Sequence, residues 1–275
     1  MTRILPDYSV TGEGPVTLFL LHGAFGAKEY WRNQLRCFSA RGLRIVAWDA
    51  PGYGVSPLPE DFSVERAAEA LTHLIARERT RTNLLLGHSM GGMVAIRTYG
   101  MMPDAIHGLI LSATSAAFGR PEGEWQRAFV RDRVAPLDRG QSLADFAPGM
   151  LRKMFAPGAD HPATELVIRI VSQMRPETFR AAIEAVSRFD AREVLPRIAV
   201  PTLCIAGGHD LSAAPPAVME KLATKIAQGE YRCMEHVGHF GWAEDPDGFN
   251  REVLGFLTRR LPEVAAVLAP EATGA

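Results

Sequence analysis

The 275-residue sequence has little of several features that mark specialised classes of protein. It has three cysteines, far apart and without the paired spacing of a zinc site or a redox motif, so we expect free thiols. The apolar stretch at residues 16–21 is far shorter than the roughly 20 residues that a membrane span requires. The N-terminal residues also lack the pattern of a signal peptide. We therefore predict a cytoplasmic protein with no membrane partner.

The sequence also lacks an excess of charge of either sign. Its 30 Lys and Arg residues nearly balance 31 Asp and Glu residues, which leaves a formal net charge of -1. Such a balance provides no attraction to a polyanion, so no nucleic-acid partner is expected. Hydrophobic residues at 47% and charged residues at 22% are typical of a globular protein. The sequence leaves the formation of a homo-oligomer open.

Short apolar runs alternate with stretches of helical periodicity, and this alternation predicts an α/β fold with a mostly parallel central sheet flanked by helices. The expected strands are residues 17–21, 43–48, 84–87, 106–111, 202–206 and 231–234. The expected helices are residues 29–40, 64–79 with Ser63 as N-cap, 216–226 and 246–261.

The alternation stops in the middle of the chain. Residues 118–195 contain amphipathic helical patterns separated by Pro and Gly, without a convincing strand. We therefore predict a core domain of residues 1–117 and 196–275, with residues 118–195 inserted as a helical cap. The apolar residues of this cap could line a pocket or pack the cap on the core; they include Trp125, Phe129, Met150, Met154 and Phe155.

A candidate nucleophile lies where the predicted strand 84–87 ends. Gly87-His88-Ser89-Met90-Gly91 fits G-x-S-x-G between a predicted strand and a predicted helix. At such a turn the serine adopts a strained backbone conformation that exposes its hydroxyl, and the flanking glycines leave room for the turn. Ser89 is therefore the expected nucleophile.

A serine hydroxyl needs a base beside it and a carboxylate that orients the base. Asp210 and His239 follow the next two predicted strands after the insertion, in the chain order Ser, acid, His. His236 is the competing base, but it directly ends a strand, whereas His239 lies in a glycine-flanked loop. We expect His239 as the base, Asp210 as the acid, and a structural role for His88.

Two backbone amides are expected to bind an oxyanion. One is the N–H of Met90, directly after the nucleophile, and the other is the N–H of Ala24, in the loop after strand 17–21. His22 in this loop is expected to bond the backbone and order the loop without touching substrate. No group of His, Cys, Asp and Glu has convincing metal spacing, so neither a metal nor a cofactor is expected.

The segments LLHGAFG, WDAPGYGVS, GHSMGG, AGGHD and VGHFGWAEDP resemble, in their order, those of the α/β-hydrolase fold family. Within that family the sequence is similar to the 3-oxoadipate enol-lactonase and carboxylesterase group. The resemblance implies a helical cap over the active site and hydrolysis without a cofactor.

The sequence thus predicts a serine hydrolase that cleaves a small carboxylic ester or lactone through an acyl-enzyme. Two other functions remain open. One is a hydrolase that cleaves a C–C bond of a ring-fission product, although His88 and Trp242 depart from the pattern of that group. The other is a non-catalytic receptor for a small molecule on the same fold.

Overall fold

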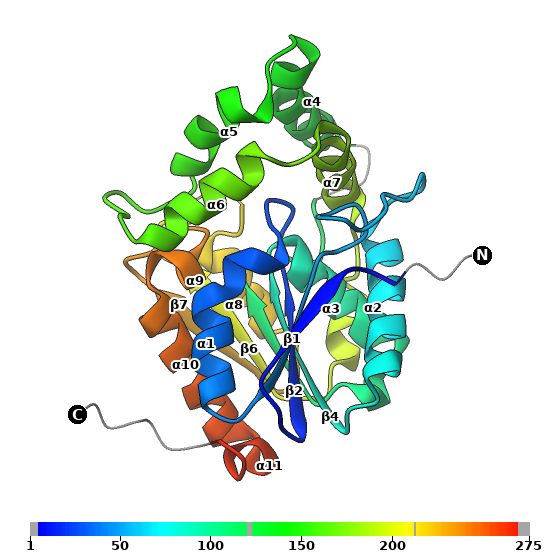
Figure 1. Cartoon of the computed structure of the whole chain (residues 1–275), viewed down its shortest axis with the longest axis vertical. Helices are drawn as coiled ribbons and strands as arrows, with labels where there is room; N and C mark the ends of the chain where they lie inside the picture. The colour runs from blue at the N-terminus through cyan, green and yellow to red at the C-terminus, as the bar shows by residue number, and fades with distance from the viewer. Residues whose placement is uncertain (1–4, 120–122, 212, 269–275) are drawn as a thin grey trace.

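The computed structural model of the protein describes residues 5–119, 123–211 and 213–268, and a seven-stranded sheet runs through its centre (Figure 1). The strands lie in the order β1-β3-β2-β4-β5-β6-β7, and every neighbouring pair is parallel except β1 and β3. They are β1 (Tyr8–Thr11), β2 (Val16–Leu21), β3 (Arg44–Trp48), β4 (Thr82–His88), β5 (Gly108–Ser112), β6 (Thr202–Gly207) and β7 (Gly229–Met234).

The six strands expected from the sequence are all present, with ends shifted by at most two residues. Every residue of β2, β5 and β6 is buried, because helices cover both faces of the sheet. The first strand was not expected from the sequence. Its residues are half-buried or exposed, so it has no continuous apolar run that would mark it in the sequence. It is held in place by antiparallel pairing with β3.

Helices flank the sheet, with α2 and α3 on one side and α1 and α10 on the other (Figure 1). The helices are α1 (Arg32–Ala40), α2 (Val64–Glu78), α3 (Met90–Met101), α4 (Glu124–Asp138), α5 (Leu143–Arg152), α6 (Pro162–Ser172), α7 (Pro176–Arg188), α8 (Pro216–Ala223), α9 (Gly241–Glu244), α10 (Pro246–Arg260) and α11 (Pro262–Ala265).

Two details of the helix prediction have different outcomes. The N-cap is confirmed, since the Ser63 hydroxyl accepts a hydrogen bond from the N–H of Arg66. The single helix expected over residues 29–40 is wrong in part, because its first turn is a separate 3₁₀ helix, Lys28–Trp31, before α1 begins. This first turn is shaped by tertiary contacts of Lys28 and Tyr30 rather than by helical periodicity.

The segment between β5 and β6 forms helices α4 to α7, which lie above one edge of the sheet (Figure 1). The two ends of this segment meet in an isolated antiparallel bridge between Ala117 and Asp190. The N–H of Phe118 also donates to the carbonyl of Phe189 over 3.0 Å. The division of the chain into a core and a cap at residues 118 and 195 remains a prediction.

A buried side-chain amide joins α1 to two helices near the C-terminal end of the chain, α9 and α10. Gln34 of α1 donates to the carbonyl of Trp242 and to the side chain of Asn250 in α10, each over 3.1 Å. The first acceptor belongs to α9 and the second to α10, so these bonds help to fix how α1 packs against both helices. The side-chain oxygen of Gln34 is buried and has no hydrogen-bond partner among the described residues.

None of the helices in residues 5–119, 123–211 and 213–268 is both long and apolar enough to cross a bilayer. No disulfide bond joins Cys37, Cys204 and Cys233, all three of which lie in the described residues.

Candidate active site

Ser89 lies at the sharp turn between β4 and α3, in a backbone conformation that residues other than glycine rarely adopt. Its φ is 54° and its ψ is -118°. The turn is held because the N–H of Ser89 donates to the carbonyl of Ser112 and its own carbonyl accepts from the hydroxyl of Thr114. Strain of this kind costs about 1–3 kcal/mol and persists where surrounding contacts determine it. The expected strained serine is confirmed.

The glycines on either side of Ser89 make this turn possible. A Cβ atom on Gly87 would collide with the carbonyl of Gly91, and a Cβ atom on Gly91 would collide with the carbonyl of Leu21. No side chain larger than hydrogen therefore fits at either position while β4 and α3 keep this arrangement.

The structure brings Asp210 and His239 together at the same edge of the sheet. The two residues follow β6 and β7, and Nδ1 of His239 lies 2.6 Å from Oδ2 of Asp210, with both side chains buried. Asp210 also accepts hydrogen bonds from the N–H groups of Ala213 and Ala214. Burial alone would raise the pKa of Asp210, but the charge of His239 and these hydrogen bonds lower it to about 2. Asp210 is therefore an anion that can orient the imidazole.

The other candidate histidines are not bonded to Asp210: His236 and His209 lie at the surface, whereas His88 packs against His239. His236 is exposed, and its Nε2 lies 2.8 Å from Asp245. His209 is exposed as well. His88 is buried with its ring centroid 4.8 Å from that of His239. Burial, reinforced by the charge of His239, lowers the pKa of His88 well below its ordinary value, so the His88 ring is neutral.

Ser89 and His239 line one small cavity beneath the helical segment. Its volume is about 50 Å³, well below the 300–1,000 Å³ that is usual for ligand pockets. Its described walls are largely apolar and include Phe25, Met93, Phe118, Phe129, Met154, Ile183 and Val186. In the described part of the chain, no hydrogen bond joins the side chains of Ser89 and His239. Such bonds often form only with substrate bound, so the shared cavity is the observation that relates the two side chains.

The two amides expected to bind an oxyanion are both without an acceptor in the described part of the chain. The N–H of Ala24 lies in the loop after β2, and that of Met90 is the first of α3, where no intrahelical acceptor exists. Ala24 also lines the cavity with Ser89. Free N–H groups at a helix start and a neighbouring loop can bind a developing negative charge.

His22 fixes the peptide unit that carries the N–H of Ala24. The N–H of Ala50 donates to Nε2 of His22 over 3.0 Å, so the ring proton lies on Nδ1. Nδ1 in turn donates to the carbonyl of Gly23 over 2.8 Å. Because the carbonyl and the N–H of a trans peptide point in opposite directions, the bond to Gly23 also sets the direction of the Ala24 N–H. The expected loop-ordering role of His22 is confirmed.

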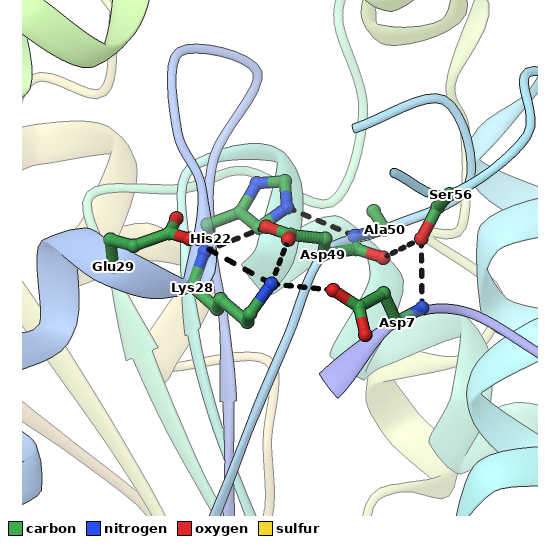
Figure 2. A network of polar contacts seen from close by, with 7 residues as sticks. All are labelled: Asp7, His22, Lys28, Glu29, Asp49, Ala50 and Ser56. Carbon is green, nitrogen blue, oxygen red and sulfur yellow. Dashed lines mark hydrogen bonds and ion pairs between the residues drawn. The ribbon is translucent and has the colours of Figure 1, made fainter. Parts of the chain in front are cut away.

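An ion-pair network beneath His22 holds the rest of this loop (Figure 2). Nζ of Lys28 lies 2.6 Å from a carboxylate oxygen of Asp49 and 2.6 Å from one of Asp7. Ser56 joins the same group by donating to the carbonyl of Asp49 and accepting from the N–H of Asp7. Burial alone would lower the pKa of Lys28, but its bonds to Asp49 and Asp7 raise it, so the ammonium group remains charged. The network ties the loop after β2 to the loop after β3.

Glu244 holds the loop that carries His239, and sequence reasoning did not identify it. Its carboxylate accepts hydrogen bonds from three backbone N–H groups, those of Gly238, Phe240 and Ala156. Two of these flank His239, and the third belongs to the segment between α5 and α6. Burial raises the pKa of Glu244, although the three hydrogen bonds oppose the shift. The sequence offered one sign of this role, namely that a carboxylate follows His239 by five residues.

Within residues 5–119, 123–211 and 213–268, no three His, Cys, Asp or Glu side chains are grouped so that they could hold a metal ion.

Comparison with known proteins agrees with this geometry. The model of the alpha/beta hydrolase family matches residues 18–252. The chain belongs to the alpha/beta hydrolase family. The family, the fold and the general class of hydrolase enzyme expected from the sequence are therefore confirmed.

Several members of the alpha/beta hydrolase family cover most of the chain. A pimeloyl-[acyl-carrier protein] methyl ester esterase of Neisseria meningitidis is 28% identical over 237 residues, 84% of this chain and 90% of that protein. The 3-oxoadipate enol-lactonase 2 of Acinetobacter baylyi is 24% identical over 268 residues, 92% of this chain and 93% of that protein. The solved structure of a thermophilic esterase from Thermogutta terrifontis has a TM-score of 0.82 and 25% identity, and the match covers 94% of this chain and 98% of that chain.

Proposed function

We propose that this hydrolase cleaves a small carboxylic ester or lactone through Ser89, His239 and Asp210. The observation that supports the proposal most directly is the buried pair of His239 and Asp210 at the cavity that Ser89 also lines. The relatives are named as a methyl ester esterase and an enol-lactonase, and a carboxylic ester and a lactone are the two kinds of bond that the proposal includes.

The proposed reaction begins when Oγ of Ser89 attacks the carbonyl carbon and passes its proton to Nε2 of His239. Asp210 accepts from Nδ1 and stabilises the imidazolium that forms. The negative charge on the carbonyl oxygen is bound by the N–H groups of Ala24 and Met90. His239 then protonates the leaving alcohol, and an acyl group remains on Ser89.

Water hydrolyses the acyl-enzyme by the same steps in the second half of the reaction. His239 takes a proton from water, and the resulting tetrahedral intermediate uses the same two amides. A lactone differs only in that its alcohol stays attached to the acyl group until this second step releases the hydroxy acid.

The experiment that tests the proposal is labelling with a fluorophosphonate, followed by mapping of the modified residue. We expect one adduct, on Ser89, and no adduct in Ser89→Ala. Ser115→Ala is the matched control, because Ser115 lines the same cavity but does not lie at the turn after β4; this variant should keep the label. An adduct on another residue, or none, would refute the proposed nucleophile.

A further inference from the structure

Arg133 lines the cavity beside Ser89. Among the described lining residues, it is the one Lys, Arg, Asp or Glu residue. Arg133 lies on α4, four residues after Phe129, so the two side chains occupy one face of the helix. The guanidinium carbon lies 3.6 Å from the centroid of the Phe129 ring, which also lines the cavity. The stacking holds the guanidinium at an otherwise apolar wall.

Arg133 has no carboxylate partner within ion-pair distance in the part of the chain that the structure describes. The nearest acidic residue in the sequence, Asp132, pairs instead with Arg131, and both of those side chains are well exposed. Burial lowers the pKa of Arg133, and the charge of Asp132 opposes the shift only in part. A partly buried, always protonated guanidinium without a counter-ion is unfavourable until an anion reaches it.

We propose that Arg133 binds a free carboxylate of the substrate, so that the preferred substrate is a small ester or lactone carrying a second, ionised carboxyl group. This inference rests on the proposed function of Ser89 for the position of the ester carbonyl. A planar guanidinium binds a carboxylate through two parallel hydrogen bonds, which gives both affinity and orientation.

Two features favour a carboxylate over a phosphate group. One guanidinium provides one positive charge, which a carboxylate neutralises, whereas a phosphate monoester carries up to two negative charges. A second feature is geometric, because the flat edge of a guanidinium matches the two coplanar oxygens of a carboxylate.

The first test measures binding without hydrolysis. Isothermal titration calorimetry compares N-methylglutaramic acid, which carries one carboxylate and an amide in place of the ester, with neutral N,N′-dimethylglutaramide. We expect the wild-type protein to bind the acid at least about tenfold more tightly, because hydrogen bonds to a charged group are stronger than neutral ones. Arg133→Met should lose this preference, and Arg133→Lys should keep part of it.

Arg131→Met is the matched control. Arg131 lies on the same helix, is exposed, and does not line the cavity, so its loss should leave the preference unchanged. Equal binding of the two compounds to the wild type, no binding of either, or an equal loss in Arg131→Met would overturn the assignment.

The second test measures kcat/KM for the p-nitrophenyl monoester of glutaric acid and for p-nitrophenyl pentanoate, which has a methyl group in place of the carboxylate. We expect the wild type to prefer the acidic ester about tenfold or more, and Arg133→Met to lose that preference while still cleaving the pentanoate. If the wild type cleaves both esters equally well, the role of Arg133 is contradicted but the proposed reaction at Ser89 is not. If the wild type binds the acid more tightly than the neutral diamide but cleaves neither ester, the proposed reaction at Ser89 is contradicted instead.

Discussion

The backbone N–H of His239 donates to the carbonyl of Met154 over 2.7 Å, which joins the loop after β7 to the segment between α5 and α6. Glu244 reinforces this junction through the N–H groups of Gly238 and Ala156. The position of the segment between α5 and α6 is therefore coupled to that of the loop that carries the proposed base.

Replacement of Glu244 by Gln should loosen this loop. A Gln side chain has one acceptor oxygen, so at least one of the buried backbone N–H groups that Glu244 now satisfies loses its partner. We expect the free energy of unfolding to fall by about 2 kcal/mol and kcat to fall with it. Urea unfolding and ester hydrolysis measure the two effects. Glu235→Gln, an exposed change in the same loop, should alter stability by no more than about 0.5 kcal/mol.

The proposed nucleophile and base should behave as one unit in kinetics. Ser89→Ala is expected to lower kcat by about 10⁴ to 10⁶, and adding His239→Ala should lower it hardly further. His236→Ala should have little effect in either background, because His236 pairs with Asp245 at the surface. Independent, multiplicative losses for Ser89 and His239 would contradict a shared reaction step.

His22→Phe should impair the proposed oxyanion site without removing a group that touches substrate. The Phe ring keeps the packing against Tyr53 but cannot hold the carbonyl of Gly23, so the N–H of Ala24 loses its fixed direction. We expect kcat to fall by about 10- to 100-fold with KM little changed, somewhat less than the full loss of an oxyanion donor.

Tyr53→Phe provides the control for His22. The Tyr53 hydroxyl donates to the carbonyl of Ala24, which belongs to the next peptide unit. Its loss should lower kcat by less than the loss of His22. Equal effects of the two variants would indicate general loosening of the loop rather than orientation of one N–H.

Asp210 should make stability depend on acid pH. Its pKa falls from an ordinary value of 3.8 to about 2 in the folded protein. Above about pH 5 the carboxylate is ionised in both states and its contribution is complete. Between pH 5 and 2 the unfolded chain binds a proton that the folded chain does not, so up to about 2 kcal/mol of stability is lost as the pH falls.

Asp210→Asn isolates this effect from other titrating groups. The difference in free energy of unfolding between the wild type and Asp210→Asn should shrink by about 2 kcal/mol between pH 5 and 2, as followed by urea unfolding. A difference that stays constant over this range would show that Asp210 does not have a lowered pKa.

The strands that could be predicted most directly are those buried on both faces, because they are nearly continuous apolar runs. Strands β2 to β6 are of this kind, whereas β1 and β7 are edge strands whose residues are mostly half-buried or exposed. β7 was nevertheless expected at residues 231–234, but β1 was missed because its position depends on hydrogen bonds to β3. The 3₁₀ turn before α1 was missed for a related reason. Its residues Lys28 and Tyr30 bond to groups outside the turn, and such tertiary contacts leave no periodic pattern.

The same distinction applies to the site. Ser89, Asp210 and His239 could be proposed because each follows a strand in a short motif, and the parallel sheet brings strand ends to one edge. Glu244 and Arg133 could not, since their importance depends on groups far away in the chain: the N–H of Ala156 for one, and the cavity wall for the other.

The hydrogen bonds of Gln34 bear on how the protein is made. Its two partners, Trp242 and Asn250, follow it by 208 and 216 positions. At the usual rate of about 5–20 residues per second, roughly 10 to 40 seconds of translation separate α1 from them. During that time neither native acceptor of the amide exists, so α1 cannot reach its final packing until α9 and α10 have emerged from the ribosome.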